Sequence, residues 1–127
     1  MKKIVILLFL TLIFSGSAKA ANYITCEEAM QAEQPFVLYF HSDTCAACKH
    51  FNPIFSQVVD KSSYNVNVVD VNFSYSQEKN ECSSVDVKAI PAVFVVNSQE
   101  NTYSKIKYET YFDNILFTES LMKLMGK

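Results

Sequence analysis

Two cysteines separated by two residues, Cys45 and Cys48, have the spacing of a redox-active pair. They follow a continuous apolar run, 36–40, and begin a segment whose apolar residues recur at helical spacing. The amino terminus of a helix carries unpaired N–H groups and a partial positive charge, which stabilise a thiolate. We therefore expect Cys45 to be an exposed nucleophile whose pKa lies below the roughly 8.5 of a free thiol. We expect Cys48 to be buried and to resolve the mixed disulfide that Cys45 forms.

A second motif, Ile90-Pro91, directly precedes the apolar run 92–96. A proline at the start of a central strand disfavours pairing with the neighbouring strand, because it has no N–H to donate. A cis peptide bond in a tight turn explains a proline at this position, and such a turn exposes the backbone of Ile90. A substrate segment could then pair with that backbone as an added strand.

The elements that position these motifs follow from the pattern of apolar and turn residues. Thr25 and Glu28 have the spacing of a capping box, which predicts a helix from Cys26 to about Glu33. The other expected elements are strands over 36–40, 66–73, 92–96 and 103–108, a helix over 45–60, a short helix within 74–82 and a C-terminal helix from about 113. The helix over 45–60 contains Pro53, which should kink it.

Some core positions are predicted as well. The inner face of the helix over 45–60 is expected to carry Cys48, Phe51, Phe55, Val58 and Val59. The C-terminal helix is expected to turn Leu116, Leu121 and Leu124 inward, and Tyr103, Tyr108 and Tyr111 are expected at or near the surface. The order of elements predicts an α/β fold, in which a mixed four-stranded sheet is covered by helices on both faces.

The first twenty residues have the pattern of a secretory signal peptide. Lys2 and Lys3 precede an apolar run over 4–14, and Ala18-Lys19-Ala20 resembles a cleavage site. The run is shorter than the roughly 20 residues that a spanning helix needs, although an uncleaved anchor is the alternative. We expect cleavage near Ala20, a single domain over 21–127, and a periplasmic or secreted location, where disulfides persist.

The segment from Tyr39 to Pro53 resembles the active-site region of thioredoxin-fold proteins, and Ala89 to Phe94 resembles their cis-proline strand. The resemblance covers essentially all of 21–127 and therefore specifies the α/β prediction as a thioredoxin fold. It implies that Cys45 attacks, Cys48 resolves and Pro91 is cis. The short separation between Cys48 and Pro91 leaves no room for an inserted helical domain, so we expect a minimal, monomeric domain that needs no cofactor.

Two positions depart from the family pattern. Thr44 stands where thioredoxins usually have Trp, so Thr44 and Ile90 are the predicted substrate-binding residues of a site with its own substrate range. Tyr39 stands where many thioredoxins bury an acid that accepts the proton of the resolving thiol. Asp70 is predicted on the neighbouring strand and on the same side of the sheet. Either Asp70 takes over this proton transfer, or it is a strand-end residue in water.

The remaining cysteines are Cys26 and Cys82. In a thioredoxin-like fold the helices that carry them share the sheet face opposite the Cys45 helix, which implies a structural disulfide. Two separate buried thiols and a second redox pair are the alternatives. No metal site is expected, because Cys26 and Cys82 do not form a second close pair beside Cys45 and Cys48. The two histidines, His41 and His50, are expected to be an ordinary strand-end residue and a solvated helix residue.

These features predict a thiol–disulfide oxidoreductase that acts on protein disulfides outside the cytoplasm. A reductase is favoured, because the domain is minimal and monomer-like. It would require a membrane electron donor, since no reducing buffer is assured outside the cytoplasm. The alternative is an adaptor or chaperone module of an envelope or secretion assembly with little redox turnover. A nucleic-acid partner is not expected, since the chain has no Arg and a net charge of −2.

Overall fold

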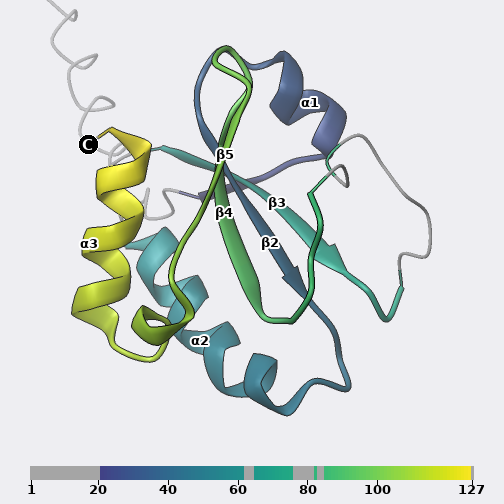
Figure 1. Cartoon of the computed structure of the whole chain (residues 1–127), viewed down its shortest axis with the longest axis vertical. Coiled ribbons are helices and arrows are strands. Elements are labelled where there is room, and N and C mark those ends of the chain that lie inside the picture. Colours follow the sequence, from purple (N-terminus) through teal and green to yellow (C-terminus); the bar gives the residue numbers. More distant parts are fainter. Residues whose placement is uncertain (1–20, 62–64, 76–81, 83–84, 127) are drawn as a thin grey trace, which may run out of the picture.

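The computed structural model describes residues 21–61, 65–75, 82 and 85–126. Its five strands form one mixed sheet in the order β1-β3-β2-β4-β5 (Figure 1). The strands are β1 (Ala21–Tyr23), β2 (Phe36–His41), β3 (Val66–Asn72), β4 (Ala92–Asn97) and β5 (Thr102–Lys105). The helices are α1 (Cys26–Gln31), α2 (Ala46–Asp60) and α3 (Asn114–Met125), with a 3-10 turn, η3, at Tyr108–Thr110.

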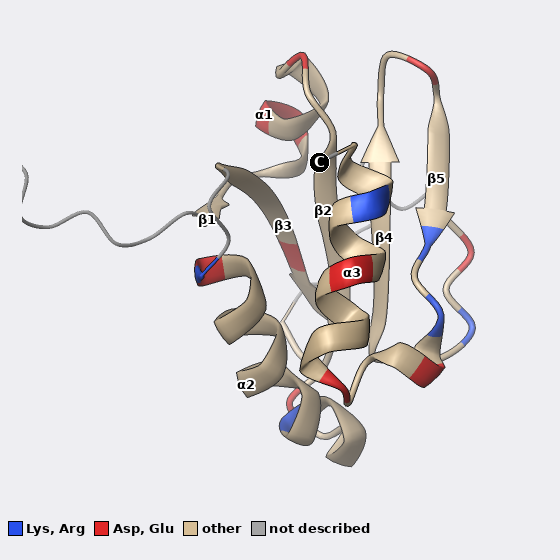
Figure 2. Ribbon diagram, turned by 90° about the vertical axis from the view of Figure 1, so that its left-hand side faces the viewer, with Lys and Arg blue, Asp and Glu red and all other residues tan. Residues whose placement is uncertain are grey.

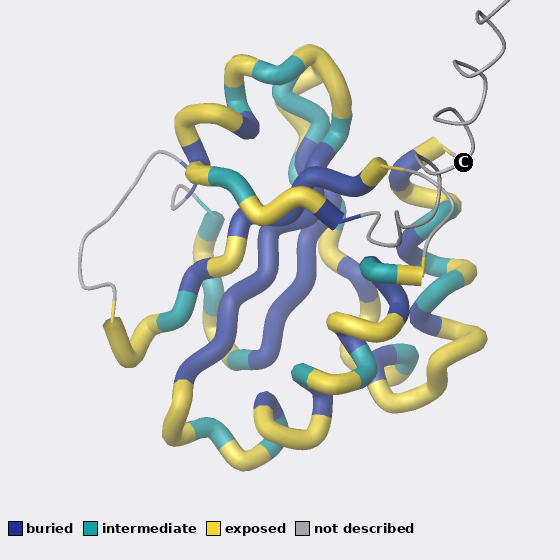
Figure 3. The backbone as a smooth tube through the Cα atoms, turned by 180° about the vertical axis from the view of Figure 1, so that it is seen from behind, coloured by how far each residue is buried: buried dark blue, intermediate teal, exposed yellow. Residues whose placement is uncertain are grey.

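The centre of the sheet is β2, whose six residues are all buried. It runs parallel to β3, with Tyr39 opposite Asp70, and antiparallel to β4, with Tyr39 opposite Val93. The continuous apolar run 36–40 is the sequence expected of a strand covered on both faces. Figure 3 shows these central strands as the buried interior of the domain. The α/β prediction, with a mixed sheet between helices, is therefore confirmed.

The sheet contains one strand more than the four predicted, because β1 pairs in parallel with β3 at the edge. Only Ala21 of its three residues is buried, so the segment has no apolar run that would predict a strand. The predicted signal segment 1–20 lies outside the described residues. Of the segment 74–82, in which a short helix is predicted, only residues 74, 75 and 82 are described. None of the described helices is long and apolar enough to cross a membrane.

Each face of the sheet has its own core. Helices α2 and α3 cover one face, where residues such as Phe51, Phe55 and Phe117 pack against inward side chains of β2 and β4 (Figure 2). Helix α1 covers the other face together with Cys82. The capping box of α1 is present, with Thr25 Oγ1 accepting the N–H of Glu28, and the helix ends at Gln31, two residues earlier than predicted. The five predicted inward residues of α2 are all buried.

The inward face of α3 differs from the prediction. Its buried residues are Phe117, Leu121 and Met125, whereas Leu116 and Leu124 are 45% and 37% exposed. These residues are spaced four apart, and Phe117 packs edge-on against the ring of Phe51, with centroids 5.1 Å apart. The prediction gave leucines more weight than the aromatic residue one position further on, and it was wrong for two of three positions.

Tyr111 was also predicted wrongly, because it is fully buried. Strand β5 ends at Lys105 rather than at 108, and the chain then turns through η3, which directs Tyr111 inward. Its ring stacks on Phe51 with centroids 4.6 Å apart, and its hydroxyl accepts the N–H of Val93 at 2.8 Å. Burial raises the pKa of Tyr111 to about 12. The other two tyrosines, Tyr103 and Tyr108, are half-buried and exposed, as expected.

We predict that Tyr111→Phe lowers the free energy of unfolding by about 1–3 kcal/mol, because the buried N–H of Val93 loses its acceptor. The matched control is Tyr108→Phe, which removes a hydroxyl from an exposed ring three residues earlier and should change stability by less than about 0.5 kcal/mol. Urea unfolding of both variants measures the difference. Equal effects would contradict a specific role for the Tyr111 hydroxyl.

Candidate active site

Cys45 and Cys48 form a disulfide at the start of α2. Cys45 is the N-cap of the helix, and the backbone N–H of Cys48 donates to Cys45 Sγ at 3.1 Å. Cys48 is fully buried, whereas Cys45 is partly exposed. This exposure pattern is the one expected of a nucleophile and a resolving thiol. The N–H and the helix terminus both favour a negative charge on Cys45 Sγ when the bridge is reduced.

The chain delivers Cys45 to this position through a short loop after β2. The N–H of Cys45 donates to the carbonyl of Ser42 at 3.4 Å, and the carbonyl of Cys45 accepts the N–H of Lys49 at 3.2 Å as the helix begins. Asp43 fixes the same loop to the end of β3, because its carboxylate accepts from Asn72 Nδ2 at 2.9 Å and its N–H donates to Ser74 Oγ at 2.8 Å. Hydrogen bonds from Asn72 and Tyr75 lower the pKa of Asp43.

The loop before β4 lies at the same end of the sheet as the start of α2 (Figure 1). The Ile90–Pro91 peptide bond is cis, the isomer that the sequence predicted. The carbonyl oxygen of Ile90 lies 3.7 Å from Cys45 Sγ, so the two motifs meet although 45 residues separate them. Pro91 is buried, Ile90 is half-buried, and Thr44 is exposed directly before the nucleophile. The structure thus brings together five predicted site residues: Thr44, Cys45, Cys48, Ile90 and Pro91.

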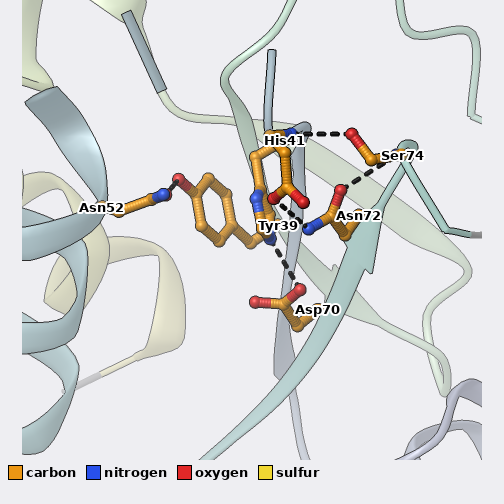
Figure 4. Close-up of polar contacts among 7 residues, drawn as sticks. Tyr39, His41, Asn52, Asp70, Asn72 and Ser74 are labelled. Atoms are coloured by element: carbon orange, nitrogen blue, oxygen red, sulfur yellow. Dashed lines mark hydrogen bonds and ion pairs between the residues drawn. The ribbon is translucent and has the colours of Figure 1, made fainter. Parts of the chain in front are cut away.

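Asp70 lies opposite Tyr39 in the register of β2 and β3, on the predicted side of the sheet. Its side chain is 37% exposed and pairs with His41, whose Nε2 lies 2.6 Å from Asp70 Oδ1 (Figure 4). Asp70 is therefore not a carboxylate surrounded by water alone. Tyr39 extends past the sheet to α2, where its hydroxyl donates to Asn52 Oδ1. Burial, and then the charge of Asp70, raise the pKa of Tyr39.

His41 differs from the ordinary strand-end residue that the sequence predicts, because it is buried and paired with Asp70. It is 9% exposed, its ring stacks on Tyr39 with centroids 4.6 Å apart, and its carbonyl accepts the N–H of Phe73 at 2.8 Å. The alternation of Tyr39 and His41 along a buried strand, with an acid on the neighbouring strand, is the signal that could have identified this pair. The prediction for His50 is confirmed, because it is exposed on α2.

Cys26 and Cys82 form the second disulfide, with their Cα atoms 6.0 Å apart. Both are buried in the core that α1 covers, on the face of the sheet opposite α2, as the family resemblance implied. The alternative of separate thiols is wrong in this structure. Among the described residues, no group of three or more His, Cys, Asp or Glu is arranged to hold a metal ion.

Residues 18–116, which are more than half of the chain, match the thioredoxin family model, and the chain belongs to the thioredoxin family. A curated relative is the thioredoxin-like protein HCF164, chloroplastic, of Oryza sativa subsp. japonica, which is 26% identical over 101 residues. The match covers 76% of this chain, which spans only 38% of the length of that relative.

Two solved structures share the fold at low sequence identity. The J-Trx1 fragment of ERdj5 superposes with a TM-score of 0.68 at 14% identity, covering 85% of this chain and 53% of that one. Thioredoxin O2 from Arabidopsis thaliana, solved in its oxidised state, superposes with a TM-score of 0.60 at 17% identity, covering 89% and 100%. The family match and the Cys45–Cys48 bridge together support thiol–disulfide exchange as the chemistry of this site.

Proposed function

We propose that this chain is a thiol–disulfide oxidoreductase that acts on protein disulfides. The observation that carries the proposal is the bridge itself: Cys45 and Cys48 are joined at the start of α2, and the Cys48 N–H donates to Cys45 Sγ. The carbonyl of Ile90, 3.7 Å from the same sulfur, offers a backbone acceptor to an extended substrate segment. An exposed Thr44 borders the same approach.

In the direction of substrate reduction, the reaction begins with the dithiol form. The Cys45 thiolate attacks one sulfur of the substrate disulfide, and the other substrate sulfur leaves as a thiolate that takes a proton from water. Cys48, after losing its proton, attacks Cys45 Sγ, which forms the Cys45–Cys48 bond and breaks the bond between Cys45 and the substrate. The second substrate thiolate leaves, so two electrons have passed from the cysteine pair to the substrate.

The same proposal places the protein outside the cytoplasm, as a periplasmic or secreted monomer. Two features support this location: the signal-peptide pattern of residues 1–20 and the buried Cys26–Cys82 bridge, since structural disulfides persist in oxidising compartments. A reductase in such a compartment needs a continuing supply of electrons, so we propose a membrane electron donor as its partner. A mature amino terminus at Ala21, in protein recovered from outside the cytoplasm, is the result that tests the export proposal.

The direction of electron flow is tested by the equilibrium redox potential of the Cys45–Cys48 pair against glutathione. We expect a value near the roughly −270 mV of a reducing thioredoxin. A value near about −120 mV, typical of strongly oxidising members of the fold, would overturn the reductase assignment. The control is the Cys26→Ser/Cys82→Ser variant, which should give the same potential because its two remaining thiols are those of the active pair.

An adaptor or chaperone role with little redox turnover is not favoured. Such a role needs no reactive cysteines, yet this chain keeps both members of the pair at the start of α2, and they are bridged. The exposure of Cys45 gives that bridge access to a partner thiol.

A further inference from the structure

At the end of β2, four residues before Cys45, the structure holds a buried group that the exchange steps above do not use. His41 is 9% exposed, and its Nε2 lies 2.6 Å from Asp70 Oδ1 (Figure 4). Its other ring nitrogen, Nδ1, is buried and has no hydrogen-bond partner among the described residues. Because an ionised carboxylate only accepts hydrogen bonds, the contact with Asp70 favours the tautomer with the proton on Nε2. In that tautomer Nδ1 is a free base inside the protein.

The packing of α2 on β2 brings this base and Cys48 toward the same end of the domain. Tyr39 contacts α2 through its hydrogen bond to Asn52. His41 lies two residues further along the same face of β2, about 6.6 Å nearer to the loop that leads into α2. Cys48 lies four residues before Asn52, about 6 Å nearer to the same loop, since the helix returns alongside the strand. This count of residues puts His41 and Cys48 at about the same level along the strand and the helix, and both are buried.

We propose that His41 is the base that takes the proton from Cys48 Sγ in the resolving step, with Asp70 as its positioning residue; this deepens the proposed thiol–disulfide exchange and rests on it. The proton of the Cys48 thiol moves to Nδ1, and the resulting imidazolium is paired with the Asp70 carboxylate. The Cys48 thiolate then attacks Cys45 Sγ and releases the substrate thiolate, and His41 later gives its proton to water.

Several titratable groups enter the pH dependence of the imidazole. Tyr39 stacks on its ring, Asp70 pairs with Nε2, and Asp43 interacts with it electrostatically. Tyr23 of β1 interacts with Asp70, and Cys48 is the buried thiol of α2. Asp70 and Asp43 are the carboxylates among them.

The test is a stopped-flow experiment with the exported protein, in which the Cys45–Cys48 pair has first been reduced. The substrate is the small disulfide 5,5′-dithiobis(2-nitrobenzoate). Attack by Cys45 releases the first equivalent of thionitrobenzoate, and resolution by Cys48 releases the second. We expect His41→Asn to slow the second phase by about 10²-fold and to shift its pH profile to that of an unassisted Cys48 thiol, because an amide cannot take up the proton. The first phase should stay within about twofold of the wild type, and His50→Asn, an exposed histidine on α2, should change neither phase.

A second variant covers the case in which His41→Asn does not fold. Asp70→Asn keeps the size of the side chain but removes the charge that positions the imidazole, so we expect a shifted inflection in the pH profile of the second phase. An unchanged profile in either variant, or an equal slowing of both phases by His41→Asn, would overturn the proposal. A wild type that releases no second equivalent would instead refute the proposed exchange itself.

Discussion

Cys45→Ser is expected to reduce the rate of insulin disulfide reduction to background, a loss of roughly 10³-fold or more. A serine hydroxyl stays protonated where the Cys45 thiol is held as a thiolate by the N–H of Cys48 and the start of α2. Cys48→Ser should also stop turnover, but for a different reason. It leaves the attacking thiolate and removes the resolving one, so the substrate remains attached to Cys45 as a mixed disulfide that mass spectrometry of the non-reduced protein detects.

The control for this pair is His50→Ser, which changes an exposed side chain later in α2 and should keep turnover within a few-fold. Trapping by Cys48→Ser but not by Cys45→Ser assigns the two roles. Equal, negligible activity in the wild type and in Cys45→Ser would contradict the enzyme and favour the adaptor. The reverse trapping pattern would contradict the assignment of Cys45 as nucleophile while leaving the exchange chemistry in place.

The sequence allowed the redox pair and its supporting elements to be predicted because each depends on local signals. A buried apolar run, a C-x-x-C at a helix start and an Ile-Pro before a strand are all contiguous in the chain. Cys48, Phe51 and Phe55 could be placed inward since helical periodicity repeats within α2 itself. The element order then limited the possible topologies to a few.

The features that were missed depend on contacts between distant segments. β1 exists because β3 offers it an edge, and Tyr111 is buried because the turn after β5 aims it at the N–H of Val93. In the sequence, His41 is only a polar residue at the end of a strand. The fold gives it a partner, because Asp70, 29 residues later, lies with Oδ1 2.6 Å from His41 Nε2. Periodicity within one segment contains no information about such partners, whereas strand register determines them.

Removing the second disulfide is expected to have the largest effect on stability. The Cys26→Ser/Cys82→Ser variant should lose about 2–4 kcal/mol of the free energy of unfolding, because the bridge joins residues 56 positions apart and restricts the unfolded chain. The bridge also ties Cys26 of α1 to Cys82, and both residues lie within the core on the face opposite α2. Urea unfolding under non-reducing conditions measures the loss, and disulfide mapping of the wild type should yield a Cys26–Cys82 peptide.

The matched control is Cys45→Ser/Cys48→Ser, which also removes two sulfurs. The bridge lost in this control joins residues only three positions apart. The chain-entropy argument gives that bridge a smaller stabilising effect, so the control should lose less stability while losing all exchange activity. The Cys26→Ser/Cys82→Ser variant should show the opposite pattern, with low stability but an active Cys45–Cys48 pair below its unfolding transition. A Cys26–Cys45 peptide, or free Cys26 in the oxidised protein, would contradict this division between one bridge that reacts and one that holds α1 in place.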